Sequence, residues 1–533
     1  MTFLTTAIDY PNGSPHIGHA YEKVLTDVLA RYHRLKGEEV YFLTGVDQHG
    51  QKMVQTAEKE GVNVATLAQK NTKKFLKLLQ ALDISNDGWA ETTHDLHKSC
   101  VAQILTDLHQ KGQLYKKQYK GFYSIRQEQF LTDQERDQDG NFGPEWGEVE
   151  EREEENWYFK LSDHTAWLRE IIETDKFGIT PAFRKAEVLN AIARAESTDL
   201  CISRPKERLS WGIELPFDKD FTTYVWFDAL INYISFAGYQ GSVGVPPASD
   251  QAGQTNNPEH PTIPDFTQLW PARFHVIGKD IMVPAHAIYW PCMLHAIGFS
   301  DDQMPNLPVH GWWNVRGEKM SKSLGNIIDP ITMVDTVGQD AVRYYLSRDI
   351  ATGKDSDFDP ERLYLLFNTE MANGLGNLLN RSLNMTKGSL GSELPAYEFD
   401  DAECQLVRDE HAKLLAAYSE RMEQQDLRGT LEALVTFITA VNTFAERTQP
   451  WQLKKDEAKR DQLVAVLHHM CEACAQASIL LTPFLPAAAA KMQAQLNLDS
   501  SNLKLPDLQW GLLKPGHTTN KPKPVFPRLE KPD

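Results

Sequence analysis

Residues 3–19 read FLTTAIDYPNGSPHIGH, and this stretch decides the fold of the first part of the chain. Residues 3–8 are apolar-rich and partly β-branched, which is typical of a buried strand. Residues 11–15 form a turn that can cap a helix, with a proline at the first helical position. Apolar residues then recur at helical spacing, and 40–43 is the next strand. The pattern predicts a strand–helix–strand unit of a parallel sheet.

Composition divides the rest of the 533-residue chain, which is too long for one ordinary domain. Strand-like apolar runs return at 224–227 and 274–278, after a long stretch of different character, so an insertion splits one α/β domain. From about 360 to 492 the chain is almost entirely helix-like. We expect an α/β fold with a doubly wound parallel-sheet (Rossmann-like) domain. This domain would lie in two halves, 1–117 and 223–328, on either side of a connective insertion at 118–222. A linking segment at 329–362, an all-α helix bundle at 363–510 and an extended tail at 511–533 would follow.

The charge and hydropathy of the chain exclude some classes of protein. A net charge of −18 argues against a uniform basic coating for nucleic acid, although it leaves room for a basic stripe on an acidic body. No run of about 20 apolar residues occurs, and the N-terminus shows no basic segment followed by an apolar one. We therefore expect no membrane association and a cytoplasmic location.

Six cysteines are too few and too scattered for a disulfide framework. Cys471 and Cys474 form a C-x-x-C pair inside a helix-like stretch, with no second pair nearby. We interpret them as thiols on a helix face rather than as redox or metal groups.

His16-Ile17-Gly18-His19 falls at the predicted N-terminus of the first helix. That end of a helix presents unpaired N–H groups and a partial positive charge, which suit a phosphate. Two imidazoles about one turn apart add donors, and Gly18 leaves room for a base or ribose. Alone, two histidines at a helix start are more often structural or exposed.

Lys319-Met320-Ser321-Lys322-Ser323 follows Gly317 in a polar loop. Two ammonium groups beside two hydroxyls can balance the charge of a triphosphate as pyrophosphate departs. A nearby glycine suits a loop that closes over substrate. Alone, this motif could equally be a solvated basic turn.

Together, the order and separation of the two motifs resemble the paired signatures of class I aminoacyl-tRNA synthetases. Similarity to the methionyl-tRNA synthetase family extends from about residue 3 to about residue 490, with part of the tail. Four other segments carry it: TAIDYPNGS (6–14), FLTGVDQHG (42–50), YVWFDA (224–229) and VIGKDI (276–281).

The resemblance implies an activity. The split domain would be catalytic, the linking segment would contact the tRNA stem, and the helix bundle would bind the anticodon. The enzyme would be a methionine–tRNA ligase, which activates L-methionine with ATP to methionyl-adenylate, releases pyrophosphate, and transfers methionyl to the 3′ end of tRNA(Met) for translation initiation and elongation, leaving AMP. ATP would come with Mg²⁺. Because the substrate carboxylate attacks the α-phosphate itself, catalysis is positioning plus charge stabilisation.

The resemblance also assigns roles to residues. The catalytic residues would be His16, His19, Lys319 and Lys322. ATP would be bound by His16, Gly18, His19, Gly278, Asp280 and Lys322. Methionine would lie among Ile8, Tyr10, Asp47, Trp226, Ala229, Tyr233, Ile281 and His286, with Asp47 holding its α-amino group. A polarizable thioether packs well against aromatic edges. From periodicity alone the aromatic residues would be hydrophobic core, and Asp47 a helix cap.

Two departures from the family pattern concern His286 and zinc. An extra residue, somewhere in 283–285, precedes His286, so the alignment leaves its placement open. Many relatives bind zinc in the insertion through cysteines, but the corresponding positions here hold residues that are not a zinc set: Ser124, Gln127, Gly143 and Trp146. We therefore predict no metal and no structural zinc.

The resemblance places anticodon recognition on the helix bundle. Trp451 matches a tryptophan that stacks on an anticodon base, and stacking of this kind contributes about 1–3 kcal/mol. Asn377 and Arg381 have the i, i+4 spacing of two further readers and share a helix face. Without the resemblance, Trp451 could be helix packing, and the other two a solvated face. The chain ends without the tRNA-binding barrel that makes some relatives dimers, which predicts a monomer.

Other readings remain open at this point. Leucyl, isoleucyl and valyl synthetases share both signatures but carry larger insertions, and cysteinyl synthetase has an active-site zinc for which no cysteine set is evident. A non-catalytic RNA-binding paralogue would have no reason to keep both motifs. A nucleotidylyltransferase could share the first motif but would lack the helix bundle and Trp451.

Overall fold

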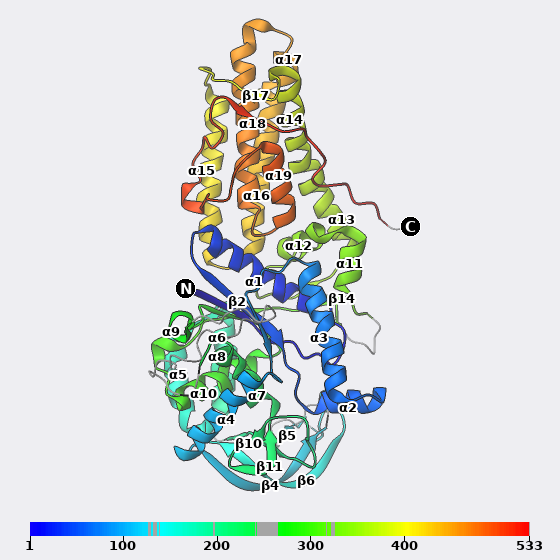
Figure 1. Cartoon of the computed structure of the whole chain (residues 1–533), viewed down its shortest axis with the longest axis vertical. Helices are drawn as coiled ribbons and strands as arrows, with labels where there is room; N and C mark the ends of the chain where they lie inside the picture. Colours follow the sequence, from blue (N-terminus) through cyan, green and yellow to red (C-terminus); the bar gives the residue numbers. More distant parts are fainter. Residues whose placement is uncertain are drawn as a thin grey trace.

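The computed structural model describes residues 1–125, 129–131, 136–137, 139–195, 198–239, 241, 265–315, 317–320 and 326–531. The molecule is elongated, with an α/β part at one end and a bundle of long helices at the other (Figure 1). This arrangement confirms the predicted fold class. The domain boundaries given above remain predictions.

A parallel sheet forms the centre of the α/β part. Within the described residues it has six strands in the order β3-β2-β1-β12-β13-β7. Every neighbouring pair is parallel. Helix α1 (Ile17–Leu35) joins β1 to β2 and completes the predicted strand–helix–strand unit. The strands are β1 (Thr2–Thr6), β2 (Val40–Val46), β3 (Gly88–Glu91), β7 (Ile179–Thr180), which falls within the range 118–222, β12 (Phe274–Gly278) and β13 (Leu307–His310).

Helices cover both faces of this sheet, because successive strand residues point to opposite sides. Leu4 and Phe42 belong to an apolar core that contains α1 and continues into the helix bundle. Their neighbours Phe3 and Tyr41 belong to a second core, with α4 (Asp95–Gln110) and α10 (Trp290–Ile297). The sheet is therefore doubly wound and buried on both sides.

Two antiparallel sheets lie at the end of the α/β part that is farthest from the bundle (Figure 1). In the longer one, β4 (Leu114–Ser124) and β6 (Val149–Phe159) pair over their whole length, and β5 (Gln129–Leu131) and β8 (Leu200–Cys201) flank them. The other contains β9 (Ser203–Pro205), β10 (Glu214–Leu215) and β11 (Asp218–Thr223). The glutamate-rich β6 lies beside lysines of β4, and Lys116 pairs with Glu155 at 3.0 Å.

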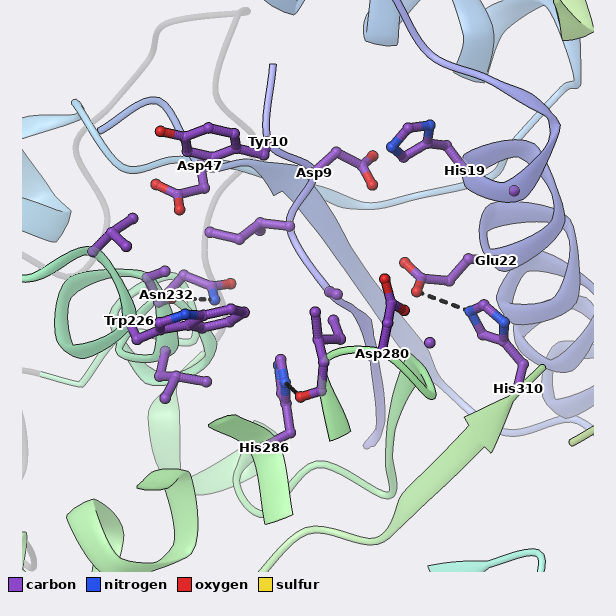
Figure 2. A pocket seen from close by; sticks show the side chains of 18 of the residues that line it. Asp9, Tyr10, His19, Glu22, Asp47, Trp226, Asn232, Asp280, His286 and His310 are labelled. Carbon is purple, nitrogen blue, oxygen red and sulfur yellow. Dashed lines mark hydrogen bonds and ion pairs between the residues drawn. The ribbon is translucent and has the colours of Figure 1, made fainter. Parts of the chain in front are cut away.

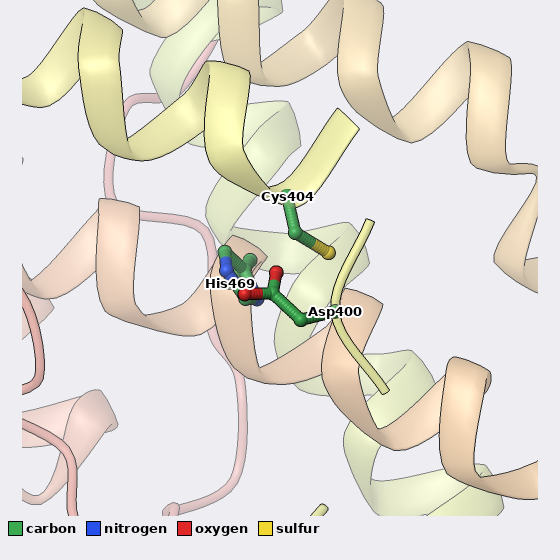
Figure 3. Close-up of side chains that lie close together, drawn as sticks. All are labelled: Asp400, Cys404 and His469. Atoms are coloured by element: carbon green, nitrogen blue, oxygen red, sulfur yellow. The ribbon is translucent and has the colours of Figure 1, made fainter. Parts of the chain in front are cut away.

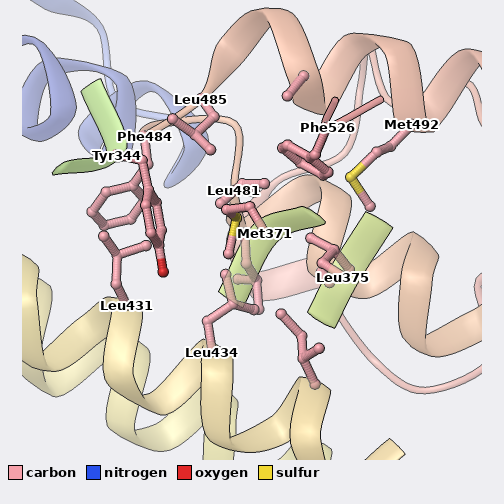
Figure 4. Close-up of a cluster of buried hydrophobic side chains, with 14 of the residues drawn as sticks. Tyr344, Met371, Leu375, Leu431, Leu434, Leu481, Phe484, Leu485, Met492 and Phe526 are labelled. Atoms are coloured by element: carbon pink, nitrogen blue, oxygen red, sulfur yellow. The ribbon is translucent and has the colours of Figure 1, made fainter. Parts of the chain in front are cut away.

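Long helices form the bundle: α14 (Asn377–Leu390), α15 (Ala402–Glu423), α16 (Leu427–Thr448), α18 (Arg460–Leu480) and α19 (Pro486–Leu496). Figure 4 shows the apolar side chains that meet where the bundle approaches the α/β part, among them Met371, Leu431 and Phe484. Phe526 of the C-terminal tail reaches the same core, so the tail runs back along the helices. One segment, Glu457–Leu480, is long and apolar enough to span a membrane, but it is buried in the bundle and reads as a core helix.

A fully buried arginine helps to join the two ends of the molecule. Arg343 lies on α12 (Gln339–Arg348), between α11 (Pro330–Val337) and α13 (Pro360–Leu366), and is fully buried. Its guanidinium pairs with Asp27 of α1 at 2.7 Å. It also donates to three carbonyl oxygens: Phe484 at 2.7 Å, Leu82 at 2.9 Å and Pro483 at 3.0 Å. One side chain therefore ties α1 to the turn between α18 and α19.

Replacing this arginine should destabilise the whole molecule. In Arg343→Met, Asp27 loses one buried cation and three carbonyl groups lose their donor, so we expect a loss of about 3–5 kcal/mol of unfolding free energy. Urea denaturation followed by tryptophan fluorescence measures it. Arg447→Met, whose side chain is 57 % exposed and pairs with Glu403, is the matched control and should lose less than about 1 kcal/mol. Equal stabilities of the two variants would contradict this role.

Candidate active site

A cavity of about 460 Å³ lies at the carboxyl ends of β1, β2, β12 and β13, beside the N-terminus of α1 (Figure 2). Parallel α/β sheets bind ligands at this edge, where the strand order reverses. Every residue assigned to ATP or methionine that the structure describes lines this one cavity: Ile8, Tyr10, His16, Gly18, His19, Asp47, Trp226, Ala229, Tyr233, Gly278, Asp280, Ile281 and His286.

The second motif is described only in part. Lys319 lies in the short strand β15 (Glu318–Lys319), and the next residue, Met320, lines the cavity. Lys322 and the side chain of Lys319 fall outside the described part of the chain. Their roles stay predictions.

His16 and His19 cap α1 in a way that settles where their protons lie. The backbone N–H of His16 donates to Nδ1 of His19 at 3.0 Å, and that of Gly18 donates to Nδ1 of His16 at 3.1 Å. Because each Nδ1 accepts, the neutral ring carries its proton on Nε2. A Cβ on Gly18 would come within 2.9 Å of the His16 ring, so only glycine permits this fold-back. Burial, reinforced by the charge of Lys23, lowers the pKa of His19 to about 4.

A buried charge network lies under this end of the cavity, and sequence reasoning missed it. Lys23, 1 % exposed, donates to Asp9 at 3.2 Å and to Glu22 at 2.9 Å. Glu22 also accepts a hydrogen bond from His310, at 3.1 Å (Figure 2). Burial raises the pKa of Asp9 to about 7 despite Lys23, whereas Lys23 and His310 outweigh burial and hold the pKa of Glu22 at about 2.

Trp226, Tyr233 and His286 form the opposite half of the cavity. Nδ1 of His286 donates to the carbonyl of Ile281 at 2.9 Å, so Nε2 is free to accept from the Tyr233 hydroxyl at 2.7 Å. Burial lowers the pKa of His286 to about 4, which keeps the ring neutral near pH 7. The helix η4 (Met282–Tyr289) departs from helical backbone angles at Val283, within the span 283–285 where the extra residue was predicted. His286 reaches the cavity in spite of the extra residue.

Asp228 acts as a brace that supports this half from outside the cavity, and although it lies in the quoted segment 224–229, sequence reasoning assigned it no role. The buried Asp228 carboxylate accepts from Nδ1 of His49 at 2.6 Å and from Nε2 of His97 at 2.7 Å. These residues come from the segment after β2, from α4 and from α7 (Val225–Leu230), which carries Trp226. The two imidazoles outweigh burial and lower the pKa of Asp228 to about 2. The brace therefore holds the turn of Asp47 and the helix of Trp226 together.

Comparison with known proteins agrees with this geometry. The family model "tRNA synthetases class I (M)" matches residues 2–139 and 146–383, and "Anticodon binding domain of methionyl tRNA ligase" matches 395–533. The methionine–tRNA ligase of Rhizobium meliloti is 36 % identical over 100 % of this chain and 98 % of its own length. That of Halalkalibacterium halodurans is 38 % identical over 99 % of this chain and 78 % of its own length.

The chain belongs to the methionyl-tRNA synthetase family. Among solved structures, that of Mycobacterium tuberculosis methionyl-tRNA synthetase in complex with methionyl-adenylate superposes with a TM-score of 0.89 at 34 % identity, covering 99 % of each chain. The family resemblance stated from the motifs is thereby confirmed. The cavity brings the assigned residues together, and their individual roles stay predictions.

Side-chain contacts join β4 to the segment around Trp146, at the positions that correspond to the zinc ligands of many relatives. Ser124, fully buried, donates to the carbonyl of Trp146 at 2.6 Å. The Tyr123 ring next to it contacts the guanidinium groups of Arg152 at 4.6 Å and Arg208 at 4.7 Å. Gly143 precedes the short helix η2 (Pro144–Trp146), and Gln127 lies outside the described residues. These contacts hold this part of the insertion by packing, and the absence of structural zinc stays a prediction.

The candidate anticodon residues lie on the far end of the bundle. Arg381 of α14 lies over the Trp451 ring of α17 (Pro450–Leu453) at 5.3 Å, and it pairs with Glu446 at 2.8 Å. Asn377 is exposed one turn earlier on α14. The structure therefore brings Arg381 and Trp451 together on a partly exposed surface, far from the cavity (Figure 1).

A second group of metal-ligand types lies inside the bundle, at Asp400, Cys404 and His469 (Figure 3). Arg408 donates to both oxygens of Asp400, at 2.8 and 2.9 Å, and to Nε2 of His469 at 3.0 Å. Burial raises the pKa of the Cys404 thiol to about 12. A guanidinium already takes the acceptors that a cation would need, so we assign no metal to this group.

Removing the brace should affect methionine more than ATP. In Asp228→Ala two buried imidazole N–H groups lose their acceptor, so the Asp47 turn and α7 should separate. We expect the KM for methionine to rise about tenfold and the KM for ATP to change less than about twofold, measured by pyrophosphate exchange.

The control is Asp95→Ala, which removes a 96 % exposed carboxylate from the helix that carries His97. It should leave both KM values unchanged. If both KM values rise in proportion in Asp228→Ala, or if neither rises, the assignment of Asp228 as a support of the methionine pocket is wrong.

Proposed function

We propose that the chain is a methionine–tRNA ligase, which joins L-methionine to tRNA(Met) in two steps with ATP. The observation that carries this proposal is the single cavity. It brings the capped end of α1, suited to phosphate, within one space with an aromatic, neutral pocket suited to a thioether. Membership of the family supports the same conclusion.

In the first step the methionine carboxylate attacks the α-phosphorus of ATP. A P–O bond forms, the bond to the β-phosphate oxygen breaks, and pyrophosphate leaves with its electron pair. His16 and His19 offer Nε2–H donors at the N-terminus of α1, where the helix dipole also favours the developing charge. Because the pKa of His19 is about 4, this ring acts near pH 7 as a neutral donor rather than as a cation.

Methionine is selected by shape and by the absence of charge in its pocket. The neutral Tyr233–His286 pair leaves no formal charge to attract a polar side chain. Asp47 is the carboxylate on the same side of the cavity, and its Oδ1 accepts from Thr92 and from the backbone of His49, both at 3.3 Å. This fixed acceptor suits the α-ammonium group.

In the second step a hydroxyl of the terminal tRNA ribose attacks the carbonyl carbon of the adenylate. A C–O bond forms to the ribose oxygen, the bond between the carbonyl carbon and the phosphate oxygen breaks, and AMP leaves with that electron pair while the hydroxyl proton passes to the leaving phosphate. Anticodon contacts at Asn377, Arg381 and Trp451 would select the tRNA. The monomeric state and the cytoplasmic location of the chain stay predictions.

Mg²⁺ would accompany ATP. This ion takes most of its ligands from phosphates and water and usually only one or two carboxylates from protein. Asp280, exposed at the cavity, is a fitting oxygen donor, since no ion pair engages it among the described residues. The ion would neutralise charge on the triphosphate.

Amino-acid-dependent exchange of labelled pyrophosphate into ATP tests the proposal. The measurement uses metal-stripped protein, all the standard amino acids, added Mg²⁺ and no zinc. We expect exchange with methionine alone, because the pocket is neutral and shaped for an unbranched thioether.

Exchange with leucine, isoleucine, valine or cysteine instead would keep the class of enzyme but refute the methionine pocket. Folded protein that exchanges with no amino acid would refute the enzyme itself. Exchange that needed added zinc would overturn the metal-free insertion.

A further inference from the structure

We propose that one exposed face of helix α3 (Val64–Ala81) binds the phosphate backbone of the tRNA. This lysine face consists of Lys70, Lys73, Lys74 and Lys77. The inference rests on the proposed function for the identity of the RNA, and on the charge and position of α3 for the surface itself.

The lysine face is the basic stripe that an acidic chain can still carry. Its four lysines have the spacing i, i+3, i+4, i+7, which places them on one side of a helix. The sequence of α3, VATLAQKNTKKFLKLLQA, contains no acidic residue, whereas the whole chain has a net charge of −18. Such a local excess of positive charge attracts a polyanion, which the remaining acidic surface of the chain repels.

Few carboxylates neutralise these lysines. Lys70 lies 3.7 Å from Glu60, and both side chains are about half exposed or more. Lys73 and Lys77 are exposed and have no ion pair within the described ranges. Like charges on adjacent turns cost free energy in the free protein, so a bound anion would stabilise the helix.

The opposite face of α3 is fixed to the start of α1. Phe75 contacts the His19 ring edge-on, with ring centres 5.3 Å apart. Asn71 donates to the carbonyl of Pro11 at 2.8 Å. From the lysine face itself, Lys74 donates to Ser14, in the same loop, at 3.3 Å. The lysine face therefore has a fixed position beside the loop that leads into the cavity.

The lysine face also lies on the flank that connects the cavity to the candidate anticodon residues. α3 packs on α11, α11 on α12, α12 on α13, α13 on η6 (Phe367–Gly376), and η6 on α14. Figure 1 shows α3, α11, α13 and α14 following one another along one side of the molecule. An RNA that reaches from Trp451 to the cavity along this side passes over α3.

The geometry suits phosphates rather than bases. Lysine is a compact point charge on a flexible stem, which binds phosphate without reading sequence. The stripe from Lys70 to Lys77 is about 10 Å long at 1.5 Å per residue, enough for about two to four phosphates of one strand. No aromatic side chain belongs to the four-residue face, so we assign it no base stacking.

The test compares Lys73→Gln/Lys77→Gln with Lys98→Gln/Lys413→Gln. The second pair removes the same two charges from α4 and α15, on the other side of the molecule (Figure 1). The probe is a fluorescent tRNA(Met) transcript, and its dissociation constant is measured by anisotropy between 50 and 300 mM KCl. Methionine-dependent pyrophosphate exchange without tRNA is measured on all proteins.

We expect the α3 variant to bind tRNA about three- to tenfold more weakly at low salt, with a salt slope reduced by about one to two. Its exchange activity without tRNA should equal that of the unchanged chain. The control variant should keep both the affinity and the slope. A shared affinity and slope for the two variants would overturn the proposal.

Two further outcomes separate this proposal from the proposed function. Absence of methionine-dependent exchange in the unchanged chain would refute the enzyme while leaving the binding result readable. A tRNA affinity that falls in the α3 variant without any change of salt slope would also refute the lysine face, because lost phosphate contacts release fewer counterions.

Discussion

The buried ion pair between Asp27 and Arg343 fixes helix α1 against the helix bundle, and the other parts of the molecule depend on where α1 lies. The N-terminus of α1 makes the phosphate end of the cavity through His16 and His19. Its length covers one face of the central sheet. Because Arg343 also holds the turn between α18 and α19, the bundle and the cavity share one rigid element. Burying a charge is costly unless its partners are all present, and here each has several.

The two halves of the cavity are supported separately. The half that we propose for the phosphates is supported by α1 and by the Lys23 network beneath it, and the half that we propose for methionine is supported by Asp228 and its two histidines. Separate supports explain how a charged nucleotide and an apolar side chain can be held in one space. Lys23 pairs with Asp9 and Glu22 beneath the half proposed for the nucleotide, while burial keeps Tyr233 and His286 neutral. The reaction then needs these groups only to position substrates and to stabilise charge.

Much of this could be predicted from the sequence because it is local. Residues 3–43 carry the strand–helix–strand pattern, and the motif at 16–19 falls at a helix start for that reason. The residues of the cavity were assigned by resemblance, and the structure brings them together. Partners distant in the chain gave no signal: His49 and Asp228 are 179 positions apart, and Ser124 and Trp146 meet only through pairing of the insertion. Lys23 reads as an ordinary helix lysine, yet it is enclosed, since only the folded sheet supplies Asp9 as its partner.

A crystal structure of the chain with a non-hydrolysable methionyl-adenylate analogue tests the central claim most directly. The account predicts the thioether between Trp226 and the Tyr233–His286 pair, the ammonium group on Asp47, and the phosphate within hydrogen-bond distance of Nε2 of His16 or His19. The Lys23 network and the Asp228 brace should keep their contacts. An analogue bound outside this cavity, or one whose phosphate lies away from the start of α1, would contradict it.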